Sequence, residues 1–357
     1  MPRKFSAYLL AIAASVSVSS AVSMAASRPA CADTLSVDTV LAREADAFLR
    51  SLSEGLQKRQ EEAVRRAMAG DDAALEAVRA SRNAPPMIPA DVVATDISEI
   101  YRLYRPASSG NARLPVLIYL HGGGWCFGSI NSCARFCAEL SRRAGVAVLA
   151  VDYPLAPRYP FPHALDASLE AVGFALANAG TYGFDTGRIS LGGDSAGGNL
   201  ALSAALAIVS GRSAGDARLP ADALRSLVLF YPVVKAWSDR SESWKAYGSG
   251  YGLDSQIMDA FNEAYAGEAD ARDPLLSPFC AASGSLAQLP PVMMVSAGRD
   301  ILRDQAVDMA SWLREAGVEV CHSILPSAVH LFITVPGQPR AFEMAVDATS
   351  AFLTEKK

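Results

Sequence analysis

Residues 188–200 read Arg188-Ile189-Ser190-Leu191-Gly192-Gly193-Asp194-Ser195-Ala196-Gly197-Gly198-Asn199-Leu200: an apolar run, a serine between glycines, and the start of an alanine-rich helical stretch. The segment 193–197 fits G-x-S-x-G, a strand-turn-helix pattern with a serine hydroxyl exposed at its apex. A Cβ at Gly193 or Gly197 is expected to collide where strand and helix backbones meet. Ser195 is expected in a strained conformation beside the helix N-terminus, which favours negative charge. The pattern predicts a nucleophilic serine, provided that other motifs accompany it.

A second glycine-rich motif precedes this turn along the chain. His121-Gly122-Gly123-Gly124-Trp125 directly follows the apolar run Leu114–Leu120, which we predict to be a strand. Consecutive glycines let backbone N–H groups point into a cleft without obstruction by Cβ atoms, as an oxyanion hole requires. We therefore predict that the N–H groups of Gly123, Gly124 and Ala196 receive a developing oxyanion.

The general base must be one of four histidines. His121 belongs to the glycine loop and is expected to shape it, and His163 stands at the start of a helix, where capping or packing is expected. His322 alternates within the apolar run 318–325 and is predicted to be a sheet residue. His330 follows that final strand near the chain end, where the base belongs in the order serine, acid, histidine.

The acid is predicted to be Asp300, which follows the strand Val292–Ser296. Asp304 stands four residues later at a helix start, where a first-turn carboxylate has a structural role with the helix dipole. The predicted catalytic triad is therefore Ser195, Asp300 and His330. In it the histidine accepts the serine proton, and the aspartate holds the imidazole tautomer and stabilises its charged form.

Apolar runs alternate with helical patterns over most of the chain, which predicts an α/β fold with a mostly parallel sheet covered on both faces. Residues 36–82 have helical periodicity with a break at 70–72, and 83–86 form a proline-containing boundary. The predicted strands are Ile97–Tyr104, Leu114–Leu120, Val146–Val151, Leu227–Tyr231, Val292–Ser296 and Val318–Leu325. The predicted helices after the boundary include Ala134–Ala144, Leu165–Ala179 and Gln305–Ala316.

The N-terminus has the layout of a secretory signal peptide: a basic start, an apolar run over 5–22, and small-residue sites that end at Ala25 and Ala32. We predict a signal peptide over residues 1–32, an exported protein in the periplasm or medium, and no stable membrane insertion after cleavage. The run is short and serine-rich for a membrane span. The mature chain is expected to begin at Asp33 or Ala26.

Composition excludes one class of partner and limits how the cysteines can pair. The chain has 357 residues, is 51% hydrophobic and carries a formal net charge of −5 without a basic patch, so nucleic acid is not an expected partner. Of its 6 cysteines, Cys31 is expected to leave with the signal peptide. The remaining number is odd, so at least one is unpaired or bridges another chain. Buried apolar packing is expected for all of them.

Taken together, these motifs resemble the bacterial hormone-sensitive-lipase-like carboxylesterases. The resemblance covers residues 114–332 and also rests on Asp152-Tyr153-Pro154-Leu155-Ala156-Pro157, Phe230-Tyr231-Pro232 and Asp300-Ile301-Leu302-Arg303-Asp304. It implies an α/β-hydrolase fold over 87–357 with an eight-stranded, mostly parallel sheet. It also implies a helical cap from residues 33–86 and an insertion at about 235–275. Such enzymes hydrolyse short- to medium-chain carboxylic esters of small molecules without a cofactor or metal.

Two positions depart from the family pattern. Leu331 follows the predicted catalytic histidine where glycine is usual, and Arg158 stands where glutamate commonly follows Leu-Ala-Pro.

The insertion over 235–271 is dense in aromatic rings, which suit the mouth of an ester pocket but equally suit packing against the sheet. The predicted substrate-pocket residues are Trp125, Trp244, Tyr251 and Leu331.

Two other functions remain open on the same scaffold. An amidase or peptidase shares the acyl-transfer mechanism, since a serine nucleophile handles either leaving group. A non-catalytic ligand-binding protein is the other alternative. The plant gibberellin receptor keeps this scaffold but lacks the catalytic histidine, so His330 favours an enzyme. The sequence leaves the oligomeric state open, and a homo-oligomer is compatible with it.

Overall fold

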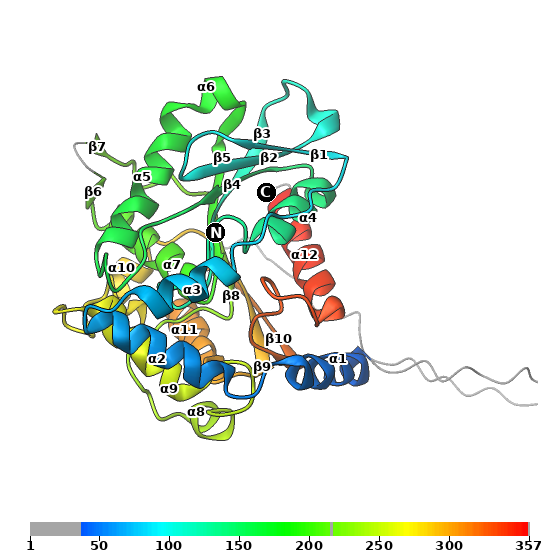
Figure 1. Ribbon diagram of the computed structural model, residues 1–357. Coiled ribbons are helices and arrows are strands. Elements are labelled where there is room, and N and C mark those ends of the chain that lie inside the picture. Colours follow the sequence, from blue (N-terminus) through cyan, green and yellow to red (C-terminus); the bar gives the residue numbers. More distant parts are fainter. Residues whose placement is uncertain (1–36, 215–216, 356–357) are drawn as a thin grey trace, which may run out of the picture. The chain divides into compact units, whose positions relative to one another are not determined.

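The computed structural model describes residues 37–214 and 217–355. Within them an eight-stranded sheet has the order β1-β2-β4-β3-β5-β8-β9-β10 (Figure 1). β2 pairs antiparallel with β1 and β4, and all other neighbours pair in parallel. The strands of this sheet are β1 (Val92–Asp96), β2 (Tyr101–Pro106), β3 (Leu114–Leu120), β4 (Ala147–Val151), β5 (Phe184–Asp194), β8 (Ser226–Phe230), β9 (Val292–Arg299) and β10 (Val320–Val329). A separate short hairpin is formed by β6 (Ser213–Ala214) and β7 (Ala217–Arg218).

Both faces of the sheet are buried, as the predicted α/β architecture requires. In β3, Val116 and Ile118 belong to one hydrophobic core, whereas Leu117 and Tyr119 belong to the other. Helices supply the other half of each core, so the central strands are apolar on both sides. The first core contains residues of α5 (His163–Ala177), α7 (Ala196–Val209) and α11 (Arg303–Glu315). The second contains residues of α4 (Ala134–Ala144) and α12 (Pro339–Thr354), which lie beside each other in Figure 1.

The helices that precede the sheet pack against elements from the second half of the chain. α1 (Val37–Ser51) contacts β10, and α2 (Leu56–Met68) lies along both α3 (Ala73–Ser81) and α9 (Ser255–Ala266) (Figure 1). We refer to α2, α3, α9 and α8 (Glu242–Ala246) as the cap. The remaining short helices are α6 (Ala179–Tyr182), α10 (Ser283–Leu286), η1 (Ala107–Ser109) and η2 (Pro278–Cys280).

Most predicted elements are confirmed, and the differences occur at their ends. Strand β3 and helix α4 have the predicted bounds to the residue. The predicted strand Ile97–Tyr104 is wrong at its start, because residues 97–100 form a turn in which the Ile97 N–H donates to the Tyr101 carbonyl at 2.9 Å. Strand β1 was not predicted at all. The last strand runs on past Leu325 to Val329 through a register shift.

The cysteines only partly follow the expectation of burial. Those at 126, 133 and 137 are buried, Cys280 is half-buried, and Cys321 on the edge strand β10 is exposed. In the described part of the chain all five are free thiols, and no cluster of metal-ligating side chains occurs there. No helix over the same residues is both long and apolar enough to cross a membrane. The predicted signal peptide, residues 1–32, lies outside the described residues.

Candidate active site

Ser195 occupies a tight turn between β5 and α7. The strand ends at Asp194, the helix begins at Ala196, and Ser195 between them has a φ of +55°. Its N–H donates to the Phe230 carbonyl of the neighbouring strand at 2.9 Å, which holds the turn against the sheet. A Cβ added to Gly197 would overlap the carbonyl of Leu120, and one added to Gly193 would overlap Gly197 itself. The predicted steric need for these glycines is therefore confirmed.

The structure places Ser195, His330 and Asp300 in one hydrogen-bonded row. The Nε2 atom of His330 lies 3.0 Å from the Oγ atom of Ser195, and its Nδ1 atom lies 2.6 Å from an Asp300 carboxylate oxygen. The other carboxylate oxygen of Asp300 accepts the Leu302 N–H at 3.0 Å. All three side chains are at most 5% exposed. The arrangement can move the serine proton to the imidazole while the carboxylate stabilises the resulting positive charge.

Parallel strands explain why these residues meet. Ser195, Asp300 and His330 each come directly after the last residue of a strand, β5, β9 and β10 respectively. Because the carboxyl ends of parallel strands lie at one edge of the sheet, three distant segments deliver their side chains to one place.

The loop that carries His330 is held by a residue that the sequence analysis missed. The side-chain amide of Gln338 accepts the Val329 N–H at 2.9 Å and donates to the Val329 and His330 carbonyls at 3.1 and 3.2 Å. Gln338 is 2% exposed. The ring of Tyr231 also packs 4.4 Å from the imidazole. Gln338 belongs to no motif, so no signal in the sequence distinguishes it from a surface glutamine.

The N–H groups of Gly123 and Gly124 have no acceptor among the described residues. Both glycines have positive φ angles, +125° and +60°, which turn these amides away from the backbone ladder of the sheet. A Cβ at Gly124 would overlap the ring of Phe261 in α9, so only glycine fits beneath the cap. Two unpaired amides beside Ser195, together with the free end of α7 at Ala196, have the character of an oxyanion hole.

Asp194 holds the glycine loop in place from below. One of its carboxylate oxygens accepts both the Tyr119 hydroxyl at 2.9 Å and the Gly122 N–H at 3.0 Å. The residue is fully buried, and burial raises the pKa of its carboxyl above the ordinary value. The x position of the G-x-S-x-G motif therefore connects the serine turn to the glycine loop.

The other three histidines lie outside the row of Ser195, His330 and Asp300. His121 is buried in the glycine loop and stacks on the Tyr153 ring at 4.3 Å. His163 begins α5, where its Nδ1 atom lies 2.9 Å from the Pro160 carbonyl oxygen. His322 lies in β10, with Nε2 at 2.9 Å from the Ser296 hydroxyl of the next strand. Each therefore lies where the sequence analysis expected it.

Asp304 has the structural role that was expected for it. Its carboxylate accepts the Ser243 N–H at 2.8 Å and the Arg303 side chain at 2.8 Å, which ties α8 of the cap to α11. Although burial by itself would raise it, these hydrogen bonds hold the pKa of Asp304 below its ordinary value.

A small pocket opens between Ser195 and the cap. On the catalytic side it is lined by Gly123, Gly124, Phe127, Ser195, His330 and Leu331. On the cap side it is lined by Gln57 and Gln60 of α2, Arg82 after α3, Ile257, Met258 and Phe261 of α9, and residues 252–253 before α9. Its cavity volume is about 30 Å³, which is room for about two or three water molecules.

Of the four predicted pocket residues, only Leu331 lines this pocket. Trp125 is fully buried and stacks on Tyr265 at 4.4 Å, because the glycine loop turns its ring into the core. Trp244 is 7% exposed and belongs to the same core, and Tyr251 packs edge-on against Tyr247 at 4.9 Å. The prediction for these three is therefore corrected: Trp125 and Trp244 pack in the hydrolase core, and Tyr251 packs in a separate cluster with Phe48 and Val329.

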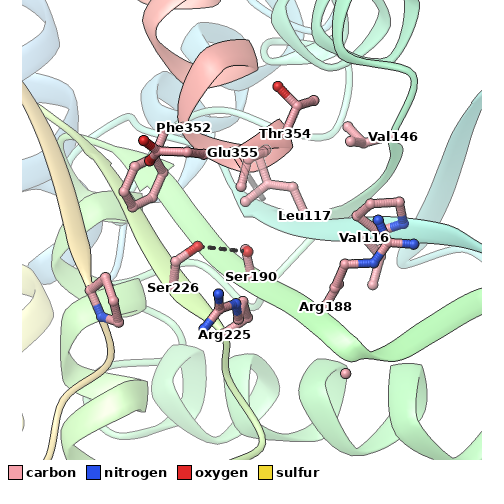
Figure 2. Close-up of a pocket in the computed structure, with 14 residues that line it drawn as sticks. Val116, Leu117, Val146, Arg188, Ser190, Arg225, Ser226, Phe352, Thr354 and Glu355 are labelled. Carbon is pink, nitrogen blue, oxygen red and sulfur yellow. Dashed lines mark hydrogen bonds between the residues drawn. The ribbon is translucent and has the colours of Figure 1, made fainter. Parts of the chain in front are cut away.

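A larger cavity, of about 490 Å³, lies at the opposite edge of the sheet near the amino ends of its strands (Figure 2). In its wall, Ser190 of β5 and Ser226 of the adjacent β8 are hydrogen-bonded to each other at 2.8 Å (Figure 2). Its described lining contains no histidine, cysteine or aspartate. Among the described residues, each of these hydroxyls is hydrogen-bonded to the other and not to Glu355, the carboxylate of this lining, whereas the small pocket contains the serine that is hydrogen-bonded to a histidine.

The chain matches the family described as alpha/beta hydrolase fold over residues 117–334. It is 39% identical to the ethyl acetate hydrolase of Pseudomonas putida over 234 residues, which cover 65% of this chain and 70% of that protein. It is 36% identical to the carboxylic ester hydrolase LipN of Mycobacterium tuberculosis over 238 residues, 66% of this chain and 61% of that one.

The solved structures that this chain resembles include an esterase and an ester hydrolase. A thermostable esterase from Pseudomonas putida superposes with a TM-score of 0.72 at 28% identity, over 87% of this chain and 95% of that one. An ester hydrolase from the metagenome of Lake Arreo, complexed with a derivative of bipyridine phosphonate, superposes with a TM-score of 0.68 at 32% identity, over 90% and 99%. With the fold and the sequence relatives in agreement, this chain belongs to the hormone-sensitive-lipase-like carboxylesterases of the α/β-hydrolase fold and is a carboxylic ester hydrolase.

Proposed function

We propose that this enzyme cleaves small carboxylic esters with short acyl groups through an acyl-enzyme on Ser195. The observation that carries the proposal is the buried row of Ser195, His330 and Asp300 beside two unpaired glycine amides. A base within hydrogen-bond reach of the hydroxyl and donors for the oxyanion are the two requirements of serine acyl transfer.

In the first half-reaction the Ser195 oxygen attacks the ester carbonyl carbon while its proton passes to Nε2 of His330. The carbonyl oxygen becomes an oxyanion and accepts hydrogen bonds from Gly123, Gly124 and Ala196. Loss of one such donor typically raises the barrier by about 2.7–4 kcal/mol. The carbon–oxygen bond to the alcohol then breaks, and His330 returns the proton to the leaving oxygen.

In the second half-reaction water takes the place of the alcohol. His330 accepts a proton from the water as its oxygen attacks the acyl carbon, and the same amides hold the new oxyanion. The bond to Ser195 breaks, the serine oxygen recovers its proton from the imidazole, and the carboxylic acid leaves. Asp300 keeps Nδ1 protonated throughout, so that Nε2 is free to accept a proton at each stage.

The size of the pocket supports short acyl groups. A cavity volume of about 30 Å³ holds only about two or three water molecules, so an acyl chain of more than a few atoms must displace cap side chains. Leu253 and Met258 are aliphatic side chains of that wall, and an unbranched methionine adapts its shape readily. Each added methylene demands further displacement, and we expect kcat/KM to fall as the acyl chain lengthens from acetyl to hexanoyl.

The proposal is tested by replacing the nucleophile. Ser195→Ala is expected to lower kcat for p-nitrophenyl acetate by at least about 10⁴-fold, because the residual rate then comes only from binding and the oxyanion donors. It is also expected to abolish covalent labelling by an alkyl phosphonate. The matched control is Ser203→Ala. Ser203 is also a buried serine of α7, and its hydroxyl has no hydrogen-bond partner among the described residues. Labelling that persists in Ser195→Ala would assign the nucleophile to another residue.

A further inference from the structure

Arg82 places a positive charge in the wall of the pocket that contains Ser195. It follows the last residue of α3 and lines the pocket together with Phe127. Its guanidinium carbon lies 5.6 Å from the centre of the Phe127 ring. Among the described residues its side chain makes no ion pair and no hydrogen bond. The neighbouring Arg79, by contrast, pairs with Glu76 and donates to two carbonyls.

An unpaired cation in such a position is costly for the folded protein. Burial lowers the pKa of Arg82 below the ordinary value, and the negative charge that opposes this effect is that of Asp194. Among the described residues Asp194 forms no hydrogen bond or ion pair with Arg82: one of its carboxylate oxygens is shared by Tyr119 and Gly122, and the other is buried without a partner. A guanidinium keeps its charge under these conditions, and because Arg82 is half-buried with no hydrogen-bond partner among the described residues, its donors are available to a ligand that provides oxygen atoms.

The side chains of the residues on either side of Arg82 anchor this segment to residues 126–131, which directly follow the glycine loop. Arg79 donates to the carbonyls of Cys126 and Ala156 at 2.9 and 2.8 Å. The side-chain oxygen of Asn83 accepts the Ser129 hydroxyl at 2.7 Å and the Asn131 amide at 2.8 Å. The backbone of Arg82 is therefore fixed beside the pocket before any substrate arrives, which reduces the ordering cost of binding.

A second donor faces the same space. Gln60 of α2 is 8% exposed and lines the pocket. Its side-chain oxygen accepts a long hydrogen bond from Gln57 at 3.5 Å, and Gln57 in turn accepts the Asp254 N–H at 3.3 Å. In the described part of the chain, the amide nitrogen of Gln60 has no acceptor. Arg82 and Gln60 thus present unpaired donors in a pocket whose described lining contains no acidic side chain.

We infer that the preferred substrates are esters that also carry a carboxylate, which binds to Arg82 and Gln60 while the ester carbonyl lies over Ser195. This inference rests on the proposed ester hydrolysis. A guanidinium matches a carboxylate with two parallel hydrogen bonds, and such pairs are shorter and stronger than neutral ones. Because one small pocket contains both Ser195 and Arg82, only a short spacer fits between the ester and the carboxylate.

The carboxylate can reside on the acyl or the alcohol side, and paired substrates of equal shape distinguish the two. On the acyl side, monoethyl succinate is compared with ethyl 4-methylpentanoate. On the alcohol side, 3-acetoxypropanoate is compared with 3-methylbutyl acetate. In each pair two methyl groups replace the two carboxylate oxygens, so the ratio of kcat/KM values isolates the charge.

For at least one pair, wild-type enzyme is expected to prefer the charged ester. Arg82→Met is expected to lower that preference by about 10- to 100-fold, the range for hydrogen bonds to charged groups. Arg82→Lys should retain part of it, because the charge remains but the two-pronged geometry is lost. The matched control is Arg65→Met in α2, whose exposed side chain pairs with Glu61 and Glu263 and should leave the ratio unchanged.

Binding without turnover provides the second measurement. Calorimetric affinity for the preferred charged ester should be lower in Ser195→Ala/Arg82→Met than in Ser195→Ala. Equal losses for the charged and the neutral ester would make Arg82 a packing residue and overturn the inference, as would a wild-type preference for the neutral ester in both pairs. Absence of turnover for all four esters would instead refute the proposed ester hydrolysis, and this inference with it.

Discussion

Strained backbone is concentrated at the candidate site. Five non-glycine residues in the described chain have positive φ, and four of them lie at or beside the site: Trp125, Ser195, Tyr231 and Leu331. Such conformations persist only where surrounding structure enforces them, and they cluster where function needs a fixed geometry. The strain at Leu331, with a φ of +73°, explains why the related enzymes use glycine after the histidine.

Replacement of Leu331 by glycine and by alanine tests whether the backbone is strained at this position. Leu331→Gly and Leu331→Ala both remove the leucine side chain, but alanine keeps the cost of a left-handed conformation, roughly 1–2 kcal/mol. The glycine variant is therefore expected to have the larger free energy of unfolding, by about 1 kcal/mol after the greater entropy of glycine in the unfolded chain is subtracted. Urea unfolding of the two variants measures the difference.

The same two variants also report on the pocket. Because Leu331 lines it, both should raise kcat/KM for p-nitrophenyl hexanoate relative to acetate, and to a similar degree. A larger free energy of unfolding for the alanine variant, which is the order at ordinary helix positions, would show that Leu331 is not strained. An unchanged acyl preference would place the size restriction elsewhere in the pocket wall.

At the scale of elements, the pairing of β9 with β10 places the acid, Asp300, beside the base, His330. Asp300 and His330 follow these two parallel strands, so their separation depends on the register of the pair. Within the pair, His322 lies half-buried with Nε2 at 2.9 Å from the Ser296 hydroxyl. Burial, together with the positive charge of Arg314, lowers the pKa of His322 to about 4.

This pKa makes the strand pair sensitive to acid. A histidine with a folded pKa of about 4 and an ordinary value of 6.5 stabilises the protein fully above pH 6.5 and loses that contribution as the pH falls toward 4. For a half-buried group we expect a loss of about 1–2 kcal/mol. His322→Gln should therefore lose less free energy of unfolding between pH 7 and pH 4 than wild type, as measured in urea. The exposed His163→Gln should behave like wild type, and equal acid losses in all three proteins would contradict this assignment.

At the scale of the whole molecule, the cap joins segments from both halves of the chain. Helix α2 packs on α9, so residues separated by about two hundred positions form the same wall above Ser195. Arg65 on α2 and Glu263 on α9 form an ion pair at 2.9 Å across this junction. Removal of the N-terminal helices would expose the site, because α2 and the residue after α3 supply one side of the pocket.

We propose that the enzyme is exported, on the basis of the basic start, apolar run and small-residue sites within residues 1–32. Expression of the full chain in a Gram-negative host should yield mature protein that begins at Asp33 or Ala26 in the periplasm or medium. Fractionation followed by N-terminal sequencing gives the result. Replacement of Arg3 and Lys4 by glutamate provides the control and should reduce export. A cytoplasmic protein with an intact Met1 would refute the proposal.

Local sequence determined the parts of this protein that depend on local sterics. The glycines around Ser195 and at 122–124 are a sequence signal for tight backbone approach, so both turns could be predicted with their residues, although the groups they approach, such as Leu120 at Gly197, are known only from the fold. Uninterrupted apolar runs likewise predicted the central strands, because such runs are stable only when both faces are covered. Short edge elements such as β1 escaped prediction, since their weak patterns depend on the strand they pair with.

The tertiary structure decided which side chains share the pocket. The sequence pattern favoured Trp244 and Tyr251 as pocket residues, yet Phe261 is the one of these three aromatic residues that lines the space above Ser195. Arg82 and Gln338 belong to no motif, and their roles arise from helices and loops that meet only in the folded chain. The physical reason is that exposure and unpaired charge are properties of packing between distant segments, whereas a turn or a strand is a property of its own residues.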